Sequence, residues 1–486
     1  MSESLSSKAA RATAWSSITE IMAKFISPIV NMVLARVLAP TEFGIIATIT
    51  MVISFAEIFT DAGFQKYLIQ QNFDDEKALN DATNVAFWTN LSISLLACVA
   101  IFIFRDHIAT FVGSPGLGDS ISIASLLIIL AAFSSIQTAR YKRDLNFKPL
   151  FFVRIGSSLI PLVVTVPLAL ILKNYWALLI GTYATHLFNS VALTLMSRWK
   201  PRFNYKWHLF NKMFSFTSWT LLESISIWLT ANIGVFIIAN KLNEYYLGLY
   251  KTSMTTINAY MGIITSAIAP VLFSTLSKYQ SNEDGFQNTY FVFQRLTAIF
   301  VIPMGVGIFV FSDFVTQILL GAQWLEASRF IGLWGLMSSL TIVFSHFSSE
   351  VFRSKGQPRA SLVVQLIHLA FLIPALLISA NFGFDILCVA RALIRIQLII
   401  TALIIMKVKF NFHILQIVCN VLPMIVSALV MGIVGIVLKT IDDTVAWQII
   451  CVLICMIVYF CILLCCFPKT RRELFESKIA KKFLKR

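Results

Sequence analysis

Charged residues are scarce in this sequence. Asp, Glu, Lys and Arg make up 13% of its 486 residues, which is about half of their share in an ordinary soluble protein. Hydrophobic residues make up 58%, and the mean hydropathy is +0.79. A soluble fold of this length has too little interior to bury so much apolar surface. The composition therefore predicts an integral membrane protein.

Histidine is also scarce, and cysteine is confined to apolar runs. The six histidines form no spaced cluster, and most of the eight cysteines lie within apolar runs, five of them in the last one. Zinc sites commonly combine such thiols with histidine or carboxylate ligands, and this run offers none. The sequence thus predicts no metal site, no disulfide framework and no cofactor.

Long apolar runs dominate what remains. A helix needs about twenty apolar residues to cross the hydrocarbon core, and by this measure the chain has about fourteen candidate spans, from Thr13–Leu38 to Ala446–Cys466. The first run is too long for a signal peptide and lacks a convincing cleavage site, so we expect it to stay as a helix. The connections are short, and the longest, of about twenty residues, is expected around Gln65–Ala82.

Positive charge collects in alternate connections. The richest segments are Arg140–Lys148, Arg198–Lys212 and Lys469–Arg486, which fall on one side of the membrane if the spans alternate. Cytoplasmic loops carry such an excess of Lys and Arg, so both termini are predicted to be cytoplasmic. The formal charge of +15 is then explained by topology and not by nucleic acid. The basic tail either rests on the anionic inner leaflet or is simply solvated.

An internal repeat relates two parts of the chain that lie 204 positions apart. Thr13-Ala14-Trp15 matches Thr217-Ser218-Trp219, and Gly44 matches Gly248. A unit of six helices enters the membrane in the same direction each time, so the repeat is parallel. We predict an all-α membrane protein with a six-helix lobe at 1–204, a second at 205–410, two additional helices at 411–467 and a basic cytoplasmic tail at 468–486.

The first two helices of each repeat carry polar residues at steps of three, four and seven, which place each set on one helix face. Polar groups in a bilayer are costly unless they face protein or water. These four helices are therefore predicted to line a water-filled cavity between the lobes. The four sets are Glu20, Lys24, Ser27 and Asn31; Thr50, Ser54, Glu57 and Asp61; Trp219, Glu223, Ser226 and Thr230; and Lys251, Thr255, Asn258 and Thr265.

Simpler explanations stand beside several of these residues. Glu20 and Lys24, four positions apart, either neutralise each other or serve the cavity. Asp61 is either functional or solvated at the cytoplasmic boundary. Lys251 either faces the cavity or extends to the outer interface.

Two arginines fall outside the four sets. Arg391 and Arg395 share one face of a later helix, and Arg395 lies near its middle. They either bind an anion within the second lobe or pair with a carboxylate such as Glu350. The sequence leaves both readings open.

Four segments resemble a known family. They are residues 33–44 (VLARVLAPTEFG), 65–70 (QKYLIQ), 139–148 (ARYKRDLNFK) and 248–250 (GLY). Together they resemble the polysaccharide-exporter branch of the multidrug/oligosaccharidyl-lipid/polysaccharide superfamily, which includes O-antigen and colanic-acid flippases. The similarity covers almost the whole chain.

The resemblance implies a fold like that of the multidrug and toxin extrusion (MATE) transporters, with alternating access. The implied substrate is an undecaprenyl-diphosphate-linked oligosaccharide unit, flipped across a bacterial inner membrane for O-antigen, capsule or exopolysaccharide synthesis. Membrane lipids, and the polymerase and chain-length regulator of the same pathway, are further candidate partners. The candidate substrate-binding residues are Lys24, Asn31, Arg36, Lys251, Asn258, Trp219, Arg391 and Arg395.

The resemblance also implies a proton or sodium ion as the coupling ion. Glu57 and Glu223, which have no obvious local cation, are the first candidates for its site, followed by Glu20 and Asp61.

Two rival functions remain. A multidrug exporter of the same superfamily would share the fold, although the basic segment 139–148 favours the polysaccharide branch. A membrane enzyme acting on the same glycolipid would need acid, base or metal groups in an outer loop. Those loops are short and hold little beyond Asp106, His107 and Asp313, so we predict a transporter and not an enzyme.

Overall fold

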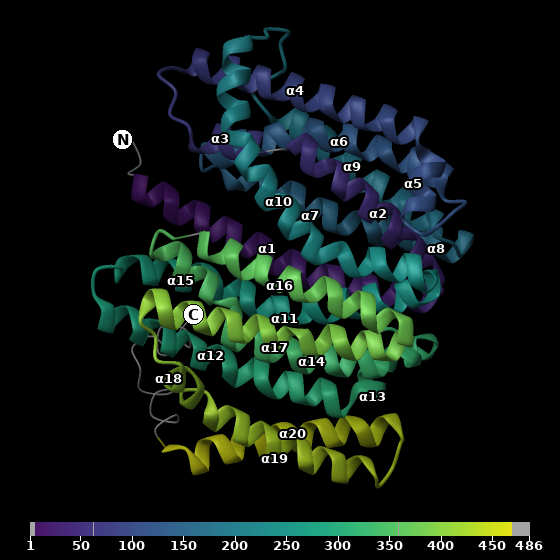
Figure 1. Ribbon diagram of the computed structural model, residues 1–486, viewed down its shortest axis with the longest axis vertical. Coiled ribbons are helices and arrows are strands. Elements are labelled where there is room, and N and C mark those ends of the chain that lie inside the picture. Colours follow the sequence, from purple (N-terminus) through teal and green to yellow (C-terminus); the bar gives the residue numbers. More distant parts are fainter. Residues whose placement is uncertain (1–4, 62, 358, 469–486) are drawn as a thin grey trace. The chain divides into compact units, whose positions relative to one another are not determined.

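The computed structural model describes residues 5–61, 63–357 and 359–468, except for the side chains of 5–14, 16–17, 20–21, 61, 215–220 and 222–223. Every regular element within these ranges is a helix (Figure 1). Thirteen of the described helical segments are long and apolar enough to cross a membrane. The helix α1 (Leu5–Val37) adds another long helix that is described only in part. The predicted all-α membrane fold is confirmed.

Two compact units divide the chain, and each is treated by itself. The first comprises Met1–Thr252 and Leu376–Phe384. Its helices are α1, α2 (Pro40–Asp61), α3 (Phe64–Gln70), α4 (Glu76–Ile103), α5 (Arg105–Phe111), α6 (Gly118–Arg143), α7 (Phe147–Ile160), η1 (Pro161–Thr165), α8 (Val166–Leu172), α9 (Trp176–Met196), α10 (Trp207–Lys241), the first part of α11 (Glu244–Lys278) and η4 (Ala380–Phe382).

The second unit comprises Ser253–Ala375 and Asp385–Arg486. After the rest of α11 it contains α12 (Glu283–Val310), α13 (Ser312–Leu319), η2 (Ala322–Ala327), α14 (Ser328–Thr341), η3 (Ile342–His346), α15 (Ser348–Ser354), α16 (Arg359–Ser379), α17 (Phe384–Phe410), α18 (Ile414–Cys419), α19 (Leu422–Lys439) and α20 (Val445–Cys466). The predicted lobe boundaries at 204 and 410 stay predictions, because compactness divides the chain inside α11 instead of between repeats.

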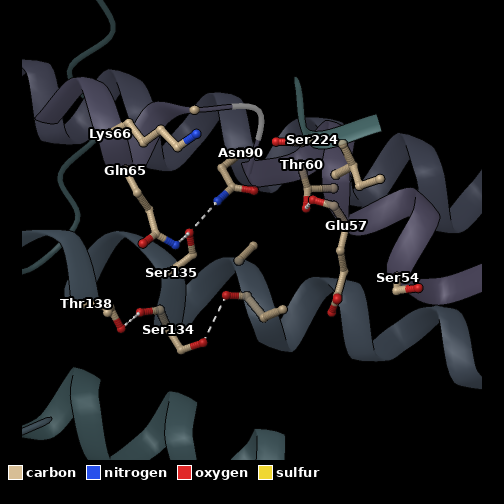
Figure 2. Close-up of a pocket in the computed structure, with 14 residues that line it drawn as sticks. Ser54, Glu57, Thr60, Gln65, Lys66, Asn90, Ser134, Ser135, Thr138 and Ser224 are labelled. Carbon is tan, nitrogen blue, oxygen red and sulfur yellow. Dashed lines mark hydrogen bonds between the residues drawn. The ribbon is translucent and has the colours of Figure 1, made fainter. Parts of the chain in front are cut away.

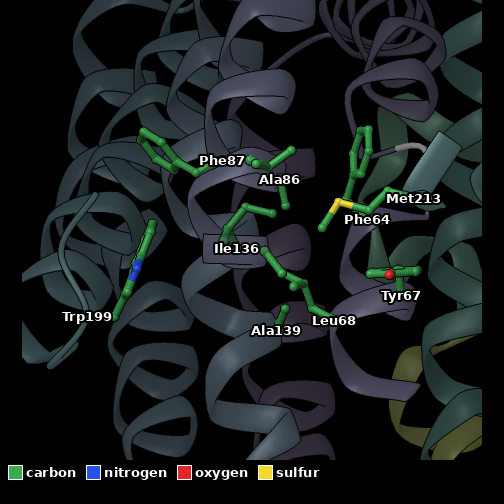
Figure 3. Close-up of a cluster of buried hydrophobic side chains, with 11 residues drawn as sticks. Phe64, Tyr67, Leu68, Ala86, Phe87, Ile136, Ala139, Trp199 and Met213 are labelled. Carbon is green, nitrogen blue, oxygen red and sulfur yellow. The ribbon is translucent and has the colours of Figure 1, made fainter. Parts of the chain in front are cut away.

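The segment predicted to be the longest loop is largely helical. Residues 64–70 form α3, and α4 begins at Glu76. The helix forms here because its apolar side bears Phe64 and Leu68, which are 1% and 0% exposed. Figure 3 shows them in a cluster with Phe87 and Ile136 of α4 and α6. This packing fixes α3 against the helices that form the polar pocket described below.

The basic segment after α9 is anchored to α4 by its backbone and side chains. Trp88 Nε1 donates to the carbonyl of Arg202 (3.0 Å), and the Arg202 amide donates to Asn84 Oδ1 (3.0 Å). Asn204 donates to Asp81 Oδ1 (2.8 Å), and the Lys206 ammonium pairs with the other oxygen of Asp81. These contacts orient the start of α10.

The two units repeat one local pattern 207 positions apart. Both α4 and α12 have 28 residues, and the residue before each accepts an amide hydrogen bond as N-cap, Asp75 from Ala78 and Asn282 from Gly285. Residues 101–104 (IFIF) match 308–311 (IFVF), and a short helix, α5 or α13, follows each. The correspondence supports an internal repeat through sequence positions other than those compared above.

The two glycines that mark the repeat form a reciprocal contact within the first unit. A Cβ on Gly44 of α2 would lie 1.8 Å from the carbonyl oxygen of Glu244, and one on Gly248 of α11 would lie 1.8 Å from that of Pro40. Pro40 and Glu244 begin their helices and are themselves 204 positions apart. The first turns of α2 and α11 therefore cross with local two-fold character, and only glycine allows the backbones so close.

Candidate functional site

A polar cavity of about 450 Å³ lies within the first unit, among α2, α3, α4, α6 and α10. Figure 2 shows Ser54, Glu57 and Thr60 on α2 and the hydroxyl residues of α6 among its lining side chains. Among the side chains that the structure describes, Glu57 is the one carboxylate in this lining and Lys66 is the one cation. A carboxylate that sequence reasoning selected for coupling thus lies in a hydroxyl-rich pocket.

The hydroxyl groups of this pocket present oxygen lone pairs. Ser54 and Thr60 each donate to a carbonyl of their own helix (3.0 Å each), as do Ser134 (3.0 Å) and Thr138 (2.8 Å) of α6. A hydroxyl has a single hydrogen, so these oxygens can act only as acceptors toward the cavity. Acceptor oxygens beside the Glu57 carboxylate form an environment suited to a cation or a proton.

Two side-chain amides connect the helices at the wall of the pocket formed by α3, α4 and α6. Gln65 Nε2 donates to Ser135 Oγ (2.9 Å), and Asn90 Nδ2 approaches the same oxygen at 3.4 Å (Figure 2). Ser135 therefore joins α3 and α4 to α6. These two hydrogen bonds fix the spacing of α3, α4 and α6 at the pocket wall.

Two of the helices predicted to face the cavity, α2 and α10, meet directly. Trp228 Nε1 of α10 donates to Ser54 Oγ of α2 at 2.9 Å, and the ring centroids of Trp228 and Phe55 lie 4.8 Å apart. The predicted polar face of α2 is thus in contact with α10 at Ser54, one turn before Glu57.

The other predicted residues of the first unit lie on α1, at the end of α2, on α10 and on α11. Lys24, Asn31 and Lys251 are partly buried, and Arg36 is exposed in the last turn of α1. The side chains of Glu20, Asp61, Trp219 and Glu223 lie outside the described residues. A role for each of these eight residues remains a prediction.

In the second unit, the predicted arginine pair meets a buried tryptophan. The Arg395 guanidinium carbon lies 3.6 Å from the Trp334 ring centroid, and that of Arg391 lies 5.0 Å from it. Trp334 is 0% exposed and Arg391 is 6% exposed. A tryptophan face attracts both cations, so one aromatic side chain helps to hold two positive charges inside the unit.

Polar groups extend this cluster in two directions. Arg395 donates to Ser338 Oγ, and Trp334 Nε1 donates to Asn258 Oδ1 at 3.1 Å. Asn258, chosen from the polar face of its helix, is therefore linked through Trp334 to the arginine pair. Glu350, the suggested carboxylate partner, is bound by Arg353 at 2.7 Å along its own helix, so that carboxylate is already engaged by a nearer cation.

Sequence reasoning missed several residues of both sites. The α6 hydroxyls Ser134, Ser135 and Thr138 lie in an apolar run, and their spacing was the available signal. Trp334 gave no signal, because a tryptophan in an apolar helix is most often a core residue.

Comparison with known proteins agrees with this architecture. The family model described as polysaccharide biosynthesis protein matches residues 33–329. The succinoglycan biosynthesis transport protein ExoT of Rhizobium meliloti is 25% identical over 315 residues, a match spanning 65% of this chain and 63% of that protein. The lipopolysaccharide biosynthesis protein WzxC of Escherichia coli K12 is 22% identical over 384 residues, 78% of this chain and 76% of that protein.

Solved structures show the fold. The lipid II flippase MurJ in an inward closed conformation matches with a TM-score of 0.78 at 13% identity, covering 94% of this chain and 99% of that one. An inward-facing multidrug resistance MATE transporter of the MOP superfamily matches with a TM-score of 0.54 at 13% identity, covering 84% and 95%. The fold is thus that of the MOP-type transporters, as the resemblance implied.

With that fold, the chain is a multi-pass membrane protein, and its curated relative ExoT is named for transport and not for catalysis. The chain belongs to the polysaccharide biosynthesis protein family.

Proposed function

We propose that this protein flips undecaprenyl-diphosphate-linked oligosaccharide units from the cytoplasmic to the outer leaflet of the bacterial inner membrane. Both termini would lie in the cytoplasm. The family match at residues 33–329 carries this proposal, because ExoT and WzxC bear transport and polysaccharide names and match much of the chain. The polymer would be an O-antigen, capsule or exopolysaccharide.

Cations supply the attraction for the diphosphate. Lys24 and Lys251 act as point charges toward the phosphates, with Arg36 near the outer mouth. Asn31 and Asn258 offer amide hydrogen bonds, and Trp219 offers an aromatic face for a sugar ring. Arg391 and Arg395 add charge within the second unit, where Trp334 orients them.

Glu57 is the proposed coupling residue with the firmest structural support. Its carboxylate lies in a pocket of acceptor oxygens, which suits a proton or a sodium ion. Ion binding there would favour one conformation of an alternating-access cycle by its differential affinity for the two states. Glu20, Asp61 and Glu223 complete the set of proposed coupling carboxylates.

Reconstitution tests the proposal. Purified protein in vesicles should expose a lipid-linked oligosaccharide on the opposite leaflet, measured by the accessibility of its sugar to an added lectin or glycosidase. An imposed proton or sodium gradient should raise the rate, and Glu57→Gln should remove that dependence. No flipping with any isolated unit from the native host would reject the proposed substrate class.

The same vesicles separate the multidrug alternative, which shares only the fold-level match to the MATE transporter. Gradient-driven uptake of cationic dyes without flipping of glycolipid would assign the protein to that function. The proposal expects glycolipid flipping and no dye transport.

A further inference from the structure

The first unit contains a second cavity, at the other side of α6. It measures about 300 Å³ and is bounded by α1, α6, α7 and α9. It shares the wall formed by Ser134 and Thr138 with the Glu57 pocket. The proposed function assigns nothing to this cavity.

The described charged residues of this cavity have one sign. Lys142 in the last turn of α6 and Arg154 in α7 both line it, and none of the lining side chains that the structure describes is a carboxylate. A lysine at a helix C-terminus is favoured by the helix dipole alone, but that argument does not reach Arg154, which is on a different helix. The neighbouring pocket around Arg140 and Arg198, by contrast, includes Asp144.

Polar groups accompany the two cations. Asn189 of α9 lines the cavity, and Ser157 of α7 donates to its side-chain oxygen, which fixes the carboxamide. Thr19 of α1 lines the same space and donates its hydroxyl hydrogen to the Trp15 carbonyl at 2.7 Å. The cavity thus combines two full positive charges with a positioned amide.

The rest of the lining is apolar and continues onto the outside of the helices. Phe147 and Leu150 line the cavity at the start of α7. Beside them the ring centroids of Trp15 and Phe151 lie 4.9 Å apart, and Phe152 is 53% exposed. An anion with an attached hydrocarbon chain matches both parts of this surface, since its charge meets the cations and its chain meets the aromatic side.

The size limits the ligand. Ligand pockets commonly range from about 300 to 1,000 Å³, so a cavity of about 300 Å³ suits a phosphate headgroup and is too small for an oligosaccharide unit. Lys142 also lies in the basic segment predicted to be cytoplasmic, and this topology would put it beside the lipid headgroups.

We propose that the cavity between α1, α6, α7 and α9 binds the phosphate of an anionic lipid through Lys142 and Arg154. The phosphate accepts hydrogen bonds from both side chains and from the Asn189 amide, and its chain lies along the start of α7. This assignment does not depend on which substrate the protein transports.

Lipid titration of the full-length protein in neutral detergent tests it. Binding is followed by native mass spectrometry and by the shift in melting temperature. The separate probes are phosphatidylglycerol, undecaprenyl phosphate, inorganic phosphate and, as the zwitterionic control, phosphatidylcholine. The variants are Lys142→Gln, Arg154→Gln, their double, and Lys148→Gln, an exposed cation of the same segment that does not line the cavity.

We expect either anionic lipid to bind more tightly than phosphatidylcholine. Each single cavity variant should weaken that binding about tenfold, which is the usual size of one charge-assisted hydrogen bond, and Lys148→Gln should leave it unchanged. The tighter of the two anionic lipids identifies the source of the phosphate.

Three results would overturn the proposal. Unchanged binding in the double variant would remove the cavity from lipid recognition. An equal loss in Lys148→Gln would mean that the whole basic segment acts by charge alone. Inorganic phosphate binding as tightly as the lipids would rule out a lipid-specific site. Because Lys142 and Arg154 are exposed, the variants should fold, and their unliganded melting temperatures check this.

Discussion

The reciprocal glycine contact between α2 and α11 permits a sharp test. In Gly44→Ala the new methyl carbon would meet the Glu244 carbonyl oxygen at 1.8 Å, and in Gly248→Ala it would meet the Pro40 carbonyl oxygen at the same distance. Both obstacles are backbone atoms, which cannot rotate aside as a flexible side chain would. The first turns of the two helices must therefore separate.

The size of the effect follows from ordinary contact distances. Non-bonded atoms prefer roughly 3.5 Å or more, so the helices must move apart by roughly 1.7 Å. Overpacking of this kind costs about 1–3 kcal/mol, and alanine recovers about 1 kcal/mol of helix propensity over glycine. Each substitution should therefore lower the free energy of unfolding by about 0–2 kcal/mol, and by about 1–3 kcal/mol relative to the same substitution at a helical glycine with open space around it.

Unfolding by a denaturing detergent, titrated into mixed micelles, measures this difference. Gly307→Ala is the matched control, because it lies in α12 and a Cβ there meets nothing within 4 Å. That variant should be neutral or stabilising. The double variant Gly44→Ala/Gly248→Ala should cost less than the sum of the single variants, because one separation of the helices relieves both contacts.

Two results would refute the reasoning. Single variants as stable as Gly307→Ala would show that the crossing is not close in the folded protein. Fully additive effects would show that the two glycines contact independent structures and do not share one crossing.

Three other predictions concern individual polar or aromatic side chains. Glu57→Gln should abolish ion-dependent flipping with normal expression, measured in reconstituted vesicles. Trp334→Phe should lower the unfolding free energy by about 1–2 kcal/mol, because it removes the hydrogen bond to Asn258 and weakens the cation–π contacts. Hydrogen bonds from Ser328 and Lys439 lower the pKa of Asp313 in the folded protein. The ionised carboxylate therefore stabilises the fold above the ordinary Asp pKa of about 4, and this stabilisation is lost as the pH falls through the lower pKa of the folded state. Stability measured against pH should therefore differ between wild type and Asp313→Asn at pH 7 and converge in acid.

Each of these has its own control. Glu283→Gln changes an exposed carboxylate and should leave flipping intact, and equal loss in both variants would remove the special role of Glu57. The double variant Trp334→Phe/Asn258→Ala should lose less unfolding free energy than the sum of the losses in the two single variants. Additive losses would argue against the hydrogen bond between Trp334 and Asn258. A difference between wild type and Asp313→Asn that persists unchanged in acid would contradict the lowered pKa of Asp313.

Hydrophobic periodicity and charge placement carry a great deal of information in this protein. Apolar runs of about twenty residues identify spanning helices, because a bilayer forces every backbone group to be satisfied within its own segment. The polar face of α2 also predicted Ser54 and Glu57 as residues that line a cavity, and both line one pocket within the first unit. Their common spacing on one helix face is a local property, so the sequence could report it.

The predictions that failed or were incomplete concern contacts between distant segments. The expected loop at 65–82 contains α3, whose stability depends on Phe87 and Ile136 far along the chain. Trp334 became significant only once α17 brought Arg395 against its face. Neither residue type nor spacing encodes such a neighbour.

The sequence by itself determined the membrane class, most of the long helices and the family, and it indicated a repeat marked by Gly44 and Gly248. The tertiary structure alone decided that these glycines allow two backbones to cross, and that α6 separates a cavity lined by Glu57 and Lys66 from one lined by Lys142 and Arg154. The physical reason is the distance along the chain over which each interaction acts. Lipid solvation and helical hydrogen bonding act within a segment, whereas packing and the grouping of charges depend on which segments meet.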